Sequence, residues 1–393
     1  MRRAGVLLAI AALVCAVAAT AATAKAPATF CVGAAKEDVT PTPAQLAEGF
    51  YNGGYGIGPQ HQAQSVIRHI YFRVIAISDC HGHQAVIGAL DSQGYSVAYQ
   101  PSFPGYGAGF RDIENDIQSN LGIPADHIIL QATHDHNGPD EIGVWGGVPA
   151  DYYQMVKHLM ETGITSAVDN EQAALLKWGT ADMTGFSGTF GSNTDDTNTG
   201  DNGDYPMDQQ LRALQAVSPS TGAVIATMVN YSTHATVYGP RDAVLPDWPG
   251  STATFLEGDE QNAQGTYGYP GSVAVVTVGA MGHTWPAGTP QATDPSVDPA
   301  ANTDNGPADI YGNAVARMAM NAVANGTFLT SHRVSGAERK VYVTNTNPVL
   351  LAAGAEPSNS SPLGGYKIGR SLTPPWGAGD VFISPVTALR IGD

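Results

Sequence analysis

Short apolar runs that alternate with amphipathic segments are the feature that most restricts how this chain can fold. The runs with the composition of buried strands are 71–78 (YFRVIAIS), 84–91, 128–133, 223–231, 273–280 and 339–344. Apolar side chains recur at helical spacing in 110–121 (FRDIENDIQSNL), 150–168 and 307–324. Apolar strands that alternate with helices predict an α/β fold whose sheets are covered by helices. The short stretch DCHGH joins the first two runs and indicates a hairpin, so we expect mixed sheets.

The N-terminal residues 1–26 have the pattern of a secretory signal peptide. Arg2 and Arg3 precede the apolar stretch GVLLAIAALVCAVAA, which is too short to span a bilayer, and small residues follow it. Elsewhere the sequence has no segment long and apolar enough for a transmembrane anchor. We therefore expect export to the periplasm or the extracellular space, with residues 27–393 as the folded part.

Composition narrows the choice of partners. The chain has 18 Lys and Arg against 35 Asp and Glu, a formal charge of −17. This charge argues against nucleic acid and anionic membrane surfaces as partners, because both are bound through basic side chains. The roughly 367 residues after the leader are enough for one large or two modest domains. Cys31 and Cys80 could form one disulfide in an oxidising compartment or remain free, since pairing cannot be deduced from sequence.

Polar residues of metal-binding type follow several of the predicted strands. Asp91 ends one strand, His134 and His136 follow another in ATHDH, and His234 and His283 follow two more. The carboxyl ends of strands in open α/β sheets form the crevice where ligands bind, and residues two apart on a strand point to one face. One histidine in such a place is usually a hydrogen-bonded structural residue. Its repetition at several strand ends predicts a metal site, and two or three histidines with a carboxylate suit Zn²⁺.

Other polar segments have simpler explanations. His81 and His83 lie in the predicted hairpin turn, where we expect them to be solvent-exposed. Asp247 in LPDWPG has the position of a helix N-cap, because Pro249 falls in the first turn of the segment that follows. Residues 192–208 and 286–309 are rich in Gly, Pro, Asp and Thr and indicate long surface loops.

Several segments resemble, in order along the chain, those of the neutral ceramidase family. Members of this family are secreted or surface zinc amidases that split ceramide into sphingosine and fatty acid. ATHDHNGP (132–139) is similar to the family's Thr-His-Thr-His-Ser-Gly-Pro signature and is the most specific match. The other matching segments are VGAAKEDVTP (32–41), GGYG (53–56), IYFRVIAI (70–77), NYSTHAT (230–236) and DWPG (247–250).

The resemblance implies roles for the histidines. His134 and His234 would bind Zn²⁺, and the metal would polarise the scissile carbonyl and lower the pKa of water. His136 would either support the metal ligands from outside or handle a proton, which it could relay to the leaving amine. It also implies a neutral-ceramidase-like catalytic domain over residues 27–393.

The sequence departs from the family pattern in places that concern the substrate. In GHTWP (282–286), His283 and Trp285 stand where the family has Asp and Ser, and the family's Asn-Arg pair has no counterpart at 192–195. The chain stops at TALRIGD (387–393), before the family's later Glu and Tyr ligands, so we expect an incomplete C-terminus. The remaining assignments are catalysis for His136 and His283, substrate binding for Tyr55 and Trp285, and support of the metal ligands for Asp91 and Asp247.

Taken together, these patterns favour a secreted zinc-dependent hydrolase of a carboxamide bond, acting on ceramide or a related lipid amide. Two alternatives stay open: a metal-dependent hydrolase of a different amide or ester, and a secreted binding protein whose site has decayed. The oligomeric state is not indicated.

Overall fold

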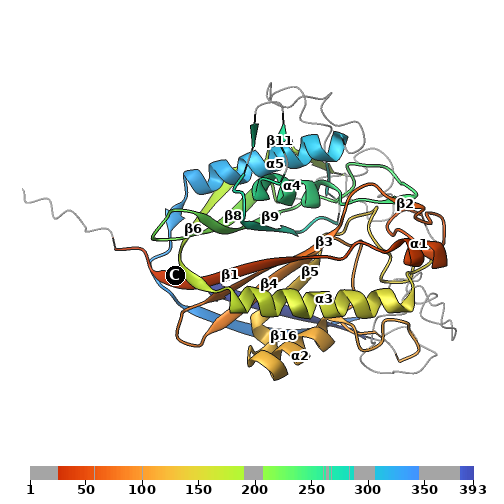
Figure 1. Ribbon diagram of the computed structural model, residues 1–393, viewed down its shortest axis with the longest axis horizontal. Helices are drawn as coiled ribbons and strands as arrows, with labels where there is room; N and C mark the ends of the chain where they lie inside the picture. Colours follow the sequence, from red (N-terminus) through yellow and green to blue (C-terminus); the bar gives the residue numbers. More distant parts are fainter. Residues whose placement is uncertain are drawn as a thin grey trace, which may run out of the picture.

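One mixed sheet of nine strands forms the centre of the computed structural model (Figure 1). The structure describes residues 25–393 except 57, 100, 190–206, 260, 263–264, 267, 283, 287–305 and 345–380. Residue His283, nearly all of the predicted signal peptide and most of the two predicted surface loops therefore lie outside the described residues.

The sheet has two halves, which we name by their strands. The first half contains β1 (Thr29–Asp38), β3 (Tyr71–Ser78), β4 (Gln84–Leu90) and β5 (Ile128–Ala132). The second half contains β6 (Gln172–Asp182), β8 (Gln210–Val217), β9 (Val224–Tyr231) and β13 (Val273–Val278), with β15 (Thr327–Phe328) beside β6. Their spatial order is β13-β9-β8-β6-β1-β3-β4-β5.

Folding of the sheet brings its two halves face to face. Strands β13 and β9 are parallel, as are β4 and β5, and the other neighbours in this order are antiparallel. Although β13 lies at one end of the order, it contacts β3 and β4 near the other end. A hydrophobic cluster that includes Phe30, Ile75, Leu176 and Val275 fills the space between the halves.

Helices cover the outer face of each half (Figure 1). Helix α3 (Ala150–Asp169) packs on β1 and β3, and α2 (Phe110–Leu121) packs on α3. Helix α5 (Gly306–Ala324) packs on β6 and β8, and α4 (Trp248–Glu257) packs on β13. The predicted α/β fold with mixed, helix-covered sheets is therefore confirmed.

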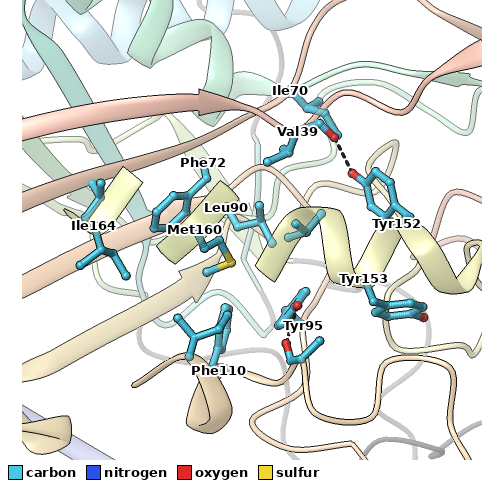
Figure 2. Packing of buried hydrophobic residues seen from close by; sticks show 14 of the residues in the cluster. Val39, Ile70, Phe72, Leu90, Tyr95, Phe110, Tyr152, Tyr153, Met160 and Ile164 are labelled. Atoms are coloured by element: carbon cyan, nitrogen blue, oxygen red, sulfur yellow. Dashed lines mark hydrogen bonds between the residues drawn. The ribbon is translucent and has the colours of Figure 1, made fainter. Parts of the chain in front are cut away.

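The first outer core shows how the sequence pattern becomes packing. In α2, Ile113 and Ile117 are buried, and Gly122 ends the helix in the left-handed region at φ 74°. In α3, Tyr152 buries its ring and donates its hydroxyl hydrogen to Val39 O at 2.8 Å (Figure 2). Met160 and Phe72 lie in the same cluster, so α3 is fixed to the strands of the first half.

Some strands were not predicted because their residues alternate. In β6, buried Ala174 and Leu176 alternate with more exposed neighbours, and β1 and β8 also mix polar with small apolar residues. The predicted 71–78/84–91 hairpin is confirmed, and His81 and His83 are exposed in its turn. Cys31 and Cys80 form a disulfide that joins β1 to this turn.

The remaining elements are short or lie beside the main sheet. They are α1 (Pro43–Gly49), η1 (Ala125–His127), β2 (Ser65–Val66), β7 (Ser187–Thr189), β10 (Ala243–Val244), β11 (Gln261–Asn262), β12 (Gly265–Thr266), β14 (Thr284–Pro286), β16 (Val334–Thr344) and β17 (Val381–Ile391). Strands β16 and β17 pair in antiparallel fashion along their full length. None of the helices in the described part combines the length and apolar character needed to cross a bilayer.

Candidate metal centre

Histidine rings from both halves of the sheet meet at one point. His134 and His136 follow β5, and His234 follows β9. The ring centroids of His134 and His234 are 4.9 Å apart. The ring centroid of His136 lies 4.6 Å from that of His134 and 5.4 Å from that of His234. One nitrogen of each ring lies within 4.8 Å of the others, a spacing that one cation can bridge.

Backbone hydrogen bonds position the two histidine segments directly against each other. Asp135 and Ala235 form an isolated parallel bridge, and His136 N donates to Ala235 O at 3.2 Å. His134 adopts a left-handed conformation at φ 61°, which is uncommon for a residue other than glycine and is often found at functional sites. The segment after β5 is therefore not a continued strand, and a turn rather than strand alternation brings His134 and His136 together.

His134 and His234 share the same outer hydrogen bond. His134 Nδ1 donates to Gln93 O at 2.9 Å, and His234 Nδ1 donates to Thr284 O at 3.0 Å. Because a carbonyl oxygen can only accept, Nδ1 carries a proton in both rings, and in the neutral form of each ring Nε2 carries the lone pair. Metal-ligating histidines almost always have such a partner on the second nitrogen. Both rings are therefore in the tautomer required for coordination through Nε2.

His136 differs from the other two rings. Its Nε2 lies 3.0 Å from His134 Nε2, while its buried Nδ1 has no hydrogen-bond partner among the described residues. The ring packs on Gly54, where a Cβ atom would lie 2.3 Å from His136 Cγ, and against Tyr55 with centroids 5.0 Å apart. His136 is thus held by packing rather than by a fixed outer hydrogen bond.

Burial keeps these rings neutral. Desolvation, together with a smaller contribution from the nearby His234, lowers the pKa of His134 to about 4. Desolvation also lowers the pKa of His136 to about 3, with contributions from both other histidines. At neutral pH these two rings therefore carry lone pairs rather than positive charge, which suits a cation.

Aromatic residues form walls beside the cluster. Trp285 stacks on His234 with ring centroids 4.7 Å apart and an interplanar angle of 7°. Tyr55 donates its hydroxyl to Tyr238 O, so its ring faces His136. Trp145 Nε1 donates to Gly56 O at 2.8 Å and holds the loop that carries Tyr55. Trp145 could not be predicted from the sequence, because nothing in its local sequence connects it with the Gly-Tyr-Gly turn.

Asp247 supports the backbone around His234. Its buried carboxylate accepts hydrogen bonds from the N–H groups of Val237, Tyr238 and Trp248, and it caps α4 as the sequence predicted. Trp248 Nε1 donates to His234 O at 2.9 Å. Burial raises the pKa of Asp247 to about 6, although the three N–H groups act in the opposite direction.

Asp91 lies behind the cluster rather than in contact with a ring. Its carboxylate accepts hydrogen bonds from Arg73 Nη1 and Tyr71 N, each at 3.0 Å. The structure therefore places Asp91 in an ion pair, and any support it gives to the metal ligands would be indirect.

The donor set fits a metal of the zinc type. Neutral imidazoles are good ligands for Zn²⁺, and two of them here have the outer partner that fixes a ligand. Within the described residues, His134, His136 and His234 are the one such group of metal-ligating side chains, and no carboxylate belongs to it.

Comparison with known proteins gives structural rather than sequence matches. No family model matches the chain, and no curated protein matches its sequence. The neutral ceramidase from Pseudomonas aeruginosa superimposes with a TM-score of 0.65 at 16% identity, over 93% of this chain and 61% of that one. A ceramidase complexed with C2 gives a TM-score of 0.63 at 15% identity, over 93% and 62%. The chain thus spans about three fifths of the length of these proteins, and over that length it has the fold of the neutral ceramidases.

Proposed function

We propose that residues 27–393 form a ceramidase-like catalytic domain that hydrolyses a carboxamide bond in a lipid, with Zn²⁺ as its cofactor and ceramide or a related lipid amide as its substrate. The observation that carries this proposal is the pair of outer hydrogen bonds that fixes His134 and His234 in the metal-binding tautomer. The ceramidase fold supports the reaction class.

His134 and His234 hold the metal in this proposal, each through Nε2. When bound, Zn²⁺ supplies a Lewis acid that polarises a carbonyl group and lowers the pKa of water towards neutrality. The carbonyl oxygens of Gln93 and Thr284 keep the two rings oriented and increase the basicity of their ligating nitrogens.

His136 carries the proton. It has no outer hydrogen-bond partner among the described residues, in contrast to the two proposed ligands, and its Nε2 lies within the cluster. It would pass a proton taken from the attacking water to the leaving amine, which is far more basic. His283, which comes directly before Thr284 in the sequence, is a further catalytic residue in this proposal.

Tyr55 and Trp285 bind the apolar part of the substrate. The ring of Tyr55 packs against His136, and that of Trp285 packs against His234. Because Trp285 is much larger than the serine found there in the family, a second candidate function calls for a test: the hydrolysis of a smaller amide or ester by the same site.

Export is also part of the proposal. The N-terminal sequence has the pattern of a signal peptide, and the Cys31–Cys80 disulfide suits an oxidising compartment.

Metal analysis and product release test the proposal together. We expect one Zn²⁺ per chain and release of fatty acid from an N-acyl sphingosine. His136→Asn should retain zinc while kcat falls about 100-fold or more, as expected for loss of proton transfer. His81→Asn, in the exposed hairpin turn, is the matched control and should change neither.

The outcomes separate the candidates. Zinc with turnover of a simple N-acyl amide or ester, but not of ceramide, would favour the second candidate. Absence of zinc from the correctly folded chain would contradict the proposal.

A further inference from the structure

A buried arginine in the first half of the sheet bridges two acidic residues, one from each half of the molecule. Arg73 on β3 is only 3% exposed. Its Nη1 donates to Asp91 Oδ2 at 3.0 Å, and its Nε donates to Glu257 Oε1 at 2.9 Å. Asp91 follows β4, and Glu257 is the last residue of α4.

We propose that Arg73 is a positioning residue for the metal centre, which fixes the separation of His134 and His234 by joining the supports of both through Asp91 and Glu257. This inference rests on the proposed metal-binding role of the two histidines.

The connection from Arg73 to His134 is short. Asp91 is followed by Ser92 and Gln93, both buried. Ser92 O accepts a hydrogen bond from Asp135 N at 3.0 Å, and Gln93 O accepts the one from His134 Nδ1. The carbonyl that sets the tautomer of His134 therefore lies two residues from the carboxylate that Arg73 holds.

The connection from Arg73 to His234 runs through helix α4. The helix ends at Glu257 and begins at Trp248, whose indole donates to His234 O. Glu257 also accepts a hydrogen bond from Ala274 N of β13 at 3.0 Å. At the other end of the helix, a Cβ on Gly250 would lie 3.4 Å from Asp91 Oδ2, so the first turn packs against the same ion pair. Helix α4 therefore meets the Arg73 network at both ends.

The chemistry of the network favours positioning over stability. Lys36 Nζ donates to Glu257 Oε2 at 2.9 Å and also pairs with Asp259, so Glu257 is bonded by two cationic side chains. Buried ion pairs add little net stability compared with apolar residues of similar size, because desolvation offsets their attraction. A guanidinium that bonds two carboxylates nevertheless sets both distance and orientation, which an ammonium cannot do.

Metal binding by Arg73→Lys tests this inference without relying on activity. Lysine keeps the charge but cannot bond both carboxylates in the same geometry. We expect Zn²⁺ affinity, measured by competition with a chelator, to fall about 10-fold, the lower end of the range for lost outer partners of metal ligands. The visible absorption spectrum of the Co²⁺-substituted protein should also change, because it reports the ligand geometry of the folded protein.

Arg111→Lys is the matched control. Arg111 also pairs with two carboxylates, Glu114 and Glu338, and joins α2 to β16 rather than to a histidine segment. We expect a smaller loss of thermal stability than in Arg73→Lys, because the Arg111 side chain is 27% exposed and that of Arg73 only 4% exposed. The Zn²⁺ affinity and Co²⁺ spectrum of Arg111→Lys should stay as in the unsubstituted protein.

The possible results distinguish this inference from the proposed function. Folded Arg73→Lys protein with unchanged affinity and spectrum would overturn the positioning role alone, whereas an unsubstituted protein that binds no metal would overturn the proposed function. If Arg73→Lys does not fold, the triple variant Arg73→Met, Asp91→Asn, Glu257→Gln removes all three charges, and it should fold with the same loss of affinity. Failure of both to fold would show that Arg73 maintains the whole fold rather than the site.

Discussion

The two halves of the sheet each provide histidine to one cluster, but they hold it by different means. In the first half, the main chain is the support: Gln93 O orients His134, and the left-handed conformation of His134 turns the chain. In the second half, Thr284 O orients the ring of His234, while the side chains of Asp247 and Trp248 hold its backbone. The position of His234 should therefore be sensitive to substitutions of Asp247 and Trp248.

The largest effect should come from removing one ligand from either half. We expect His134→Ala and His234→Ala each to abolish metal retention, because the loss of either ring leaves too few ligands for tight binding. Zinc content after dialysis measures this, with His81→Ala as the control that keeps its metal. If all three variants retained zinc equally, the ligand assignment would be wrong.

Asp247→Ala should destabilise the second half, in the backbone that follows His234. The change leaves three buried N–H groups without their acceptor and removes a helix cap, so the free energy of unfolding should fall by about 2–4 kcal/mol. Urea denaturation measures this loss. Thr42→Ala removes the N-cap of α1 instead and should cost only about 1 kcal/mol. Equal losses in the two variants would argue that Asp247 is nothing more than a cap.

Gly54→Ala should disturb the first half at His136. Its φ of +100° is unfavourable for alanine, and the new Cβ would overlap the imidazole, so we expect a loss of about 1–3 kcal/mol beyond the backbone strain. Gly58→Ala is the control, because its φ is +81° but a Cβ atom there would meet nothing within 4 Å. If the thermal unfolding temperature shifted equally in both variants, the packing of the His136 ring on Gly54 would be contradicted.

The smallest effects should appear in the pH dependence of the metal-free protein, with opposite signs for the two halves. The folded-state pKa of His136 is about 3, below its usual value, so its contribution to stability is present above about pH 6.5 and is lost as the pH falls towards 3. The pKa of Asp247 is raised to about 6, so its contribution is present below about pH 4 and is lost as the pH rises through 6.

Measuring the free energy of unfolding at about pH 4.5, 5.5 and 7 would follow both trends, because these values lie between the ordinary pKa of Asp and a pH just above that of His. On acidification, the free energy of unfolding of His136→Asn should fall by about 1–2 kcal/mol less than that of the unsubstituted protein. On going from acid to neutral pH, the free energy of unfolding of Asp247→Asn should fall by less than that of the unsubstituted protein. The same sign for both variants would contradict the comparison.

The sequence predicted the elements of the fold better than their arrangement. Residues 110–121 form α2 as predicted, because apolar spacing and Gly122 define both its face and its end. The convergence of His134 and His234 was predicted from the crevice of an open α/β sheet, yet this mixed sheet is mostly antiparallel and folded over. That folding depends on contacts such as β13 with β3, which no local pattern encodes.

The hydrogen-bond partners of the site histidines could not be predicted from the sequence either, because no local pattern encodes contacts between distant segments. The partners of the imidazoles at Gln93 and Thr284 are main-chain oxygens, so their residue types give no signal. Asp91 was singled out as a strand-end carboxylate, but its partner Arg73 was hidden within an apolar run. The Asp247 cap was predictable because Pro249 follows at the spacing of a first helical turn.

The bridge between Asp135 and Ala235 joins positions a hundred residues apart in the chain, and it has a consequence for how the protein matures. Contacts of such wide separation form slowly, because the long loop must close before they can stabilise the chain. A nascent chain should therefore complete its sheet before it can capture a cation at this site, so that cation uptake would report the end of folding rather than start it.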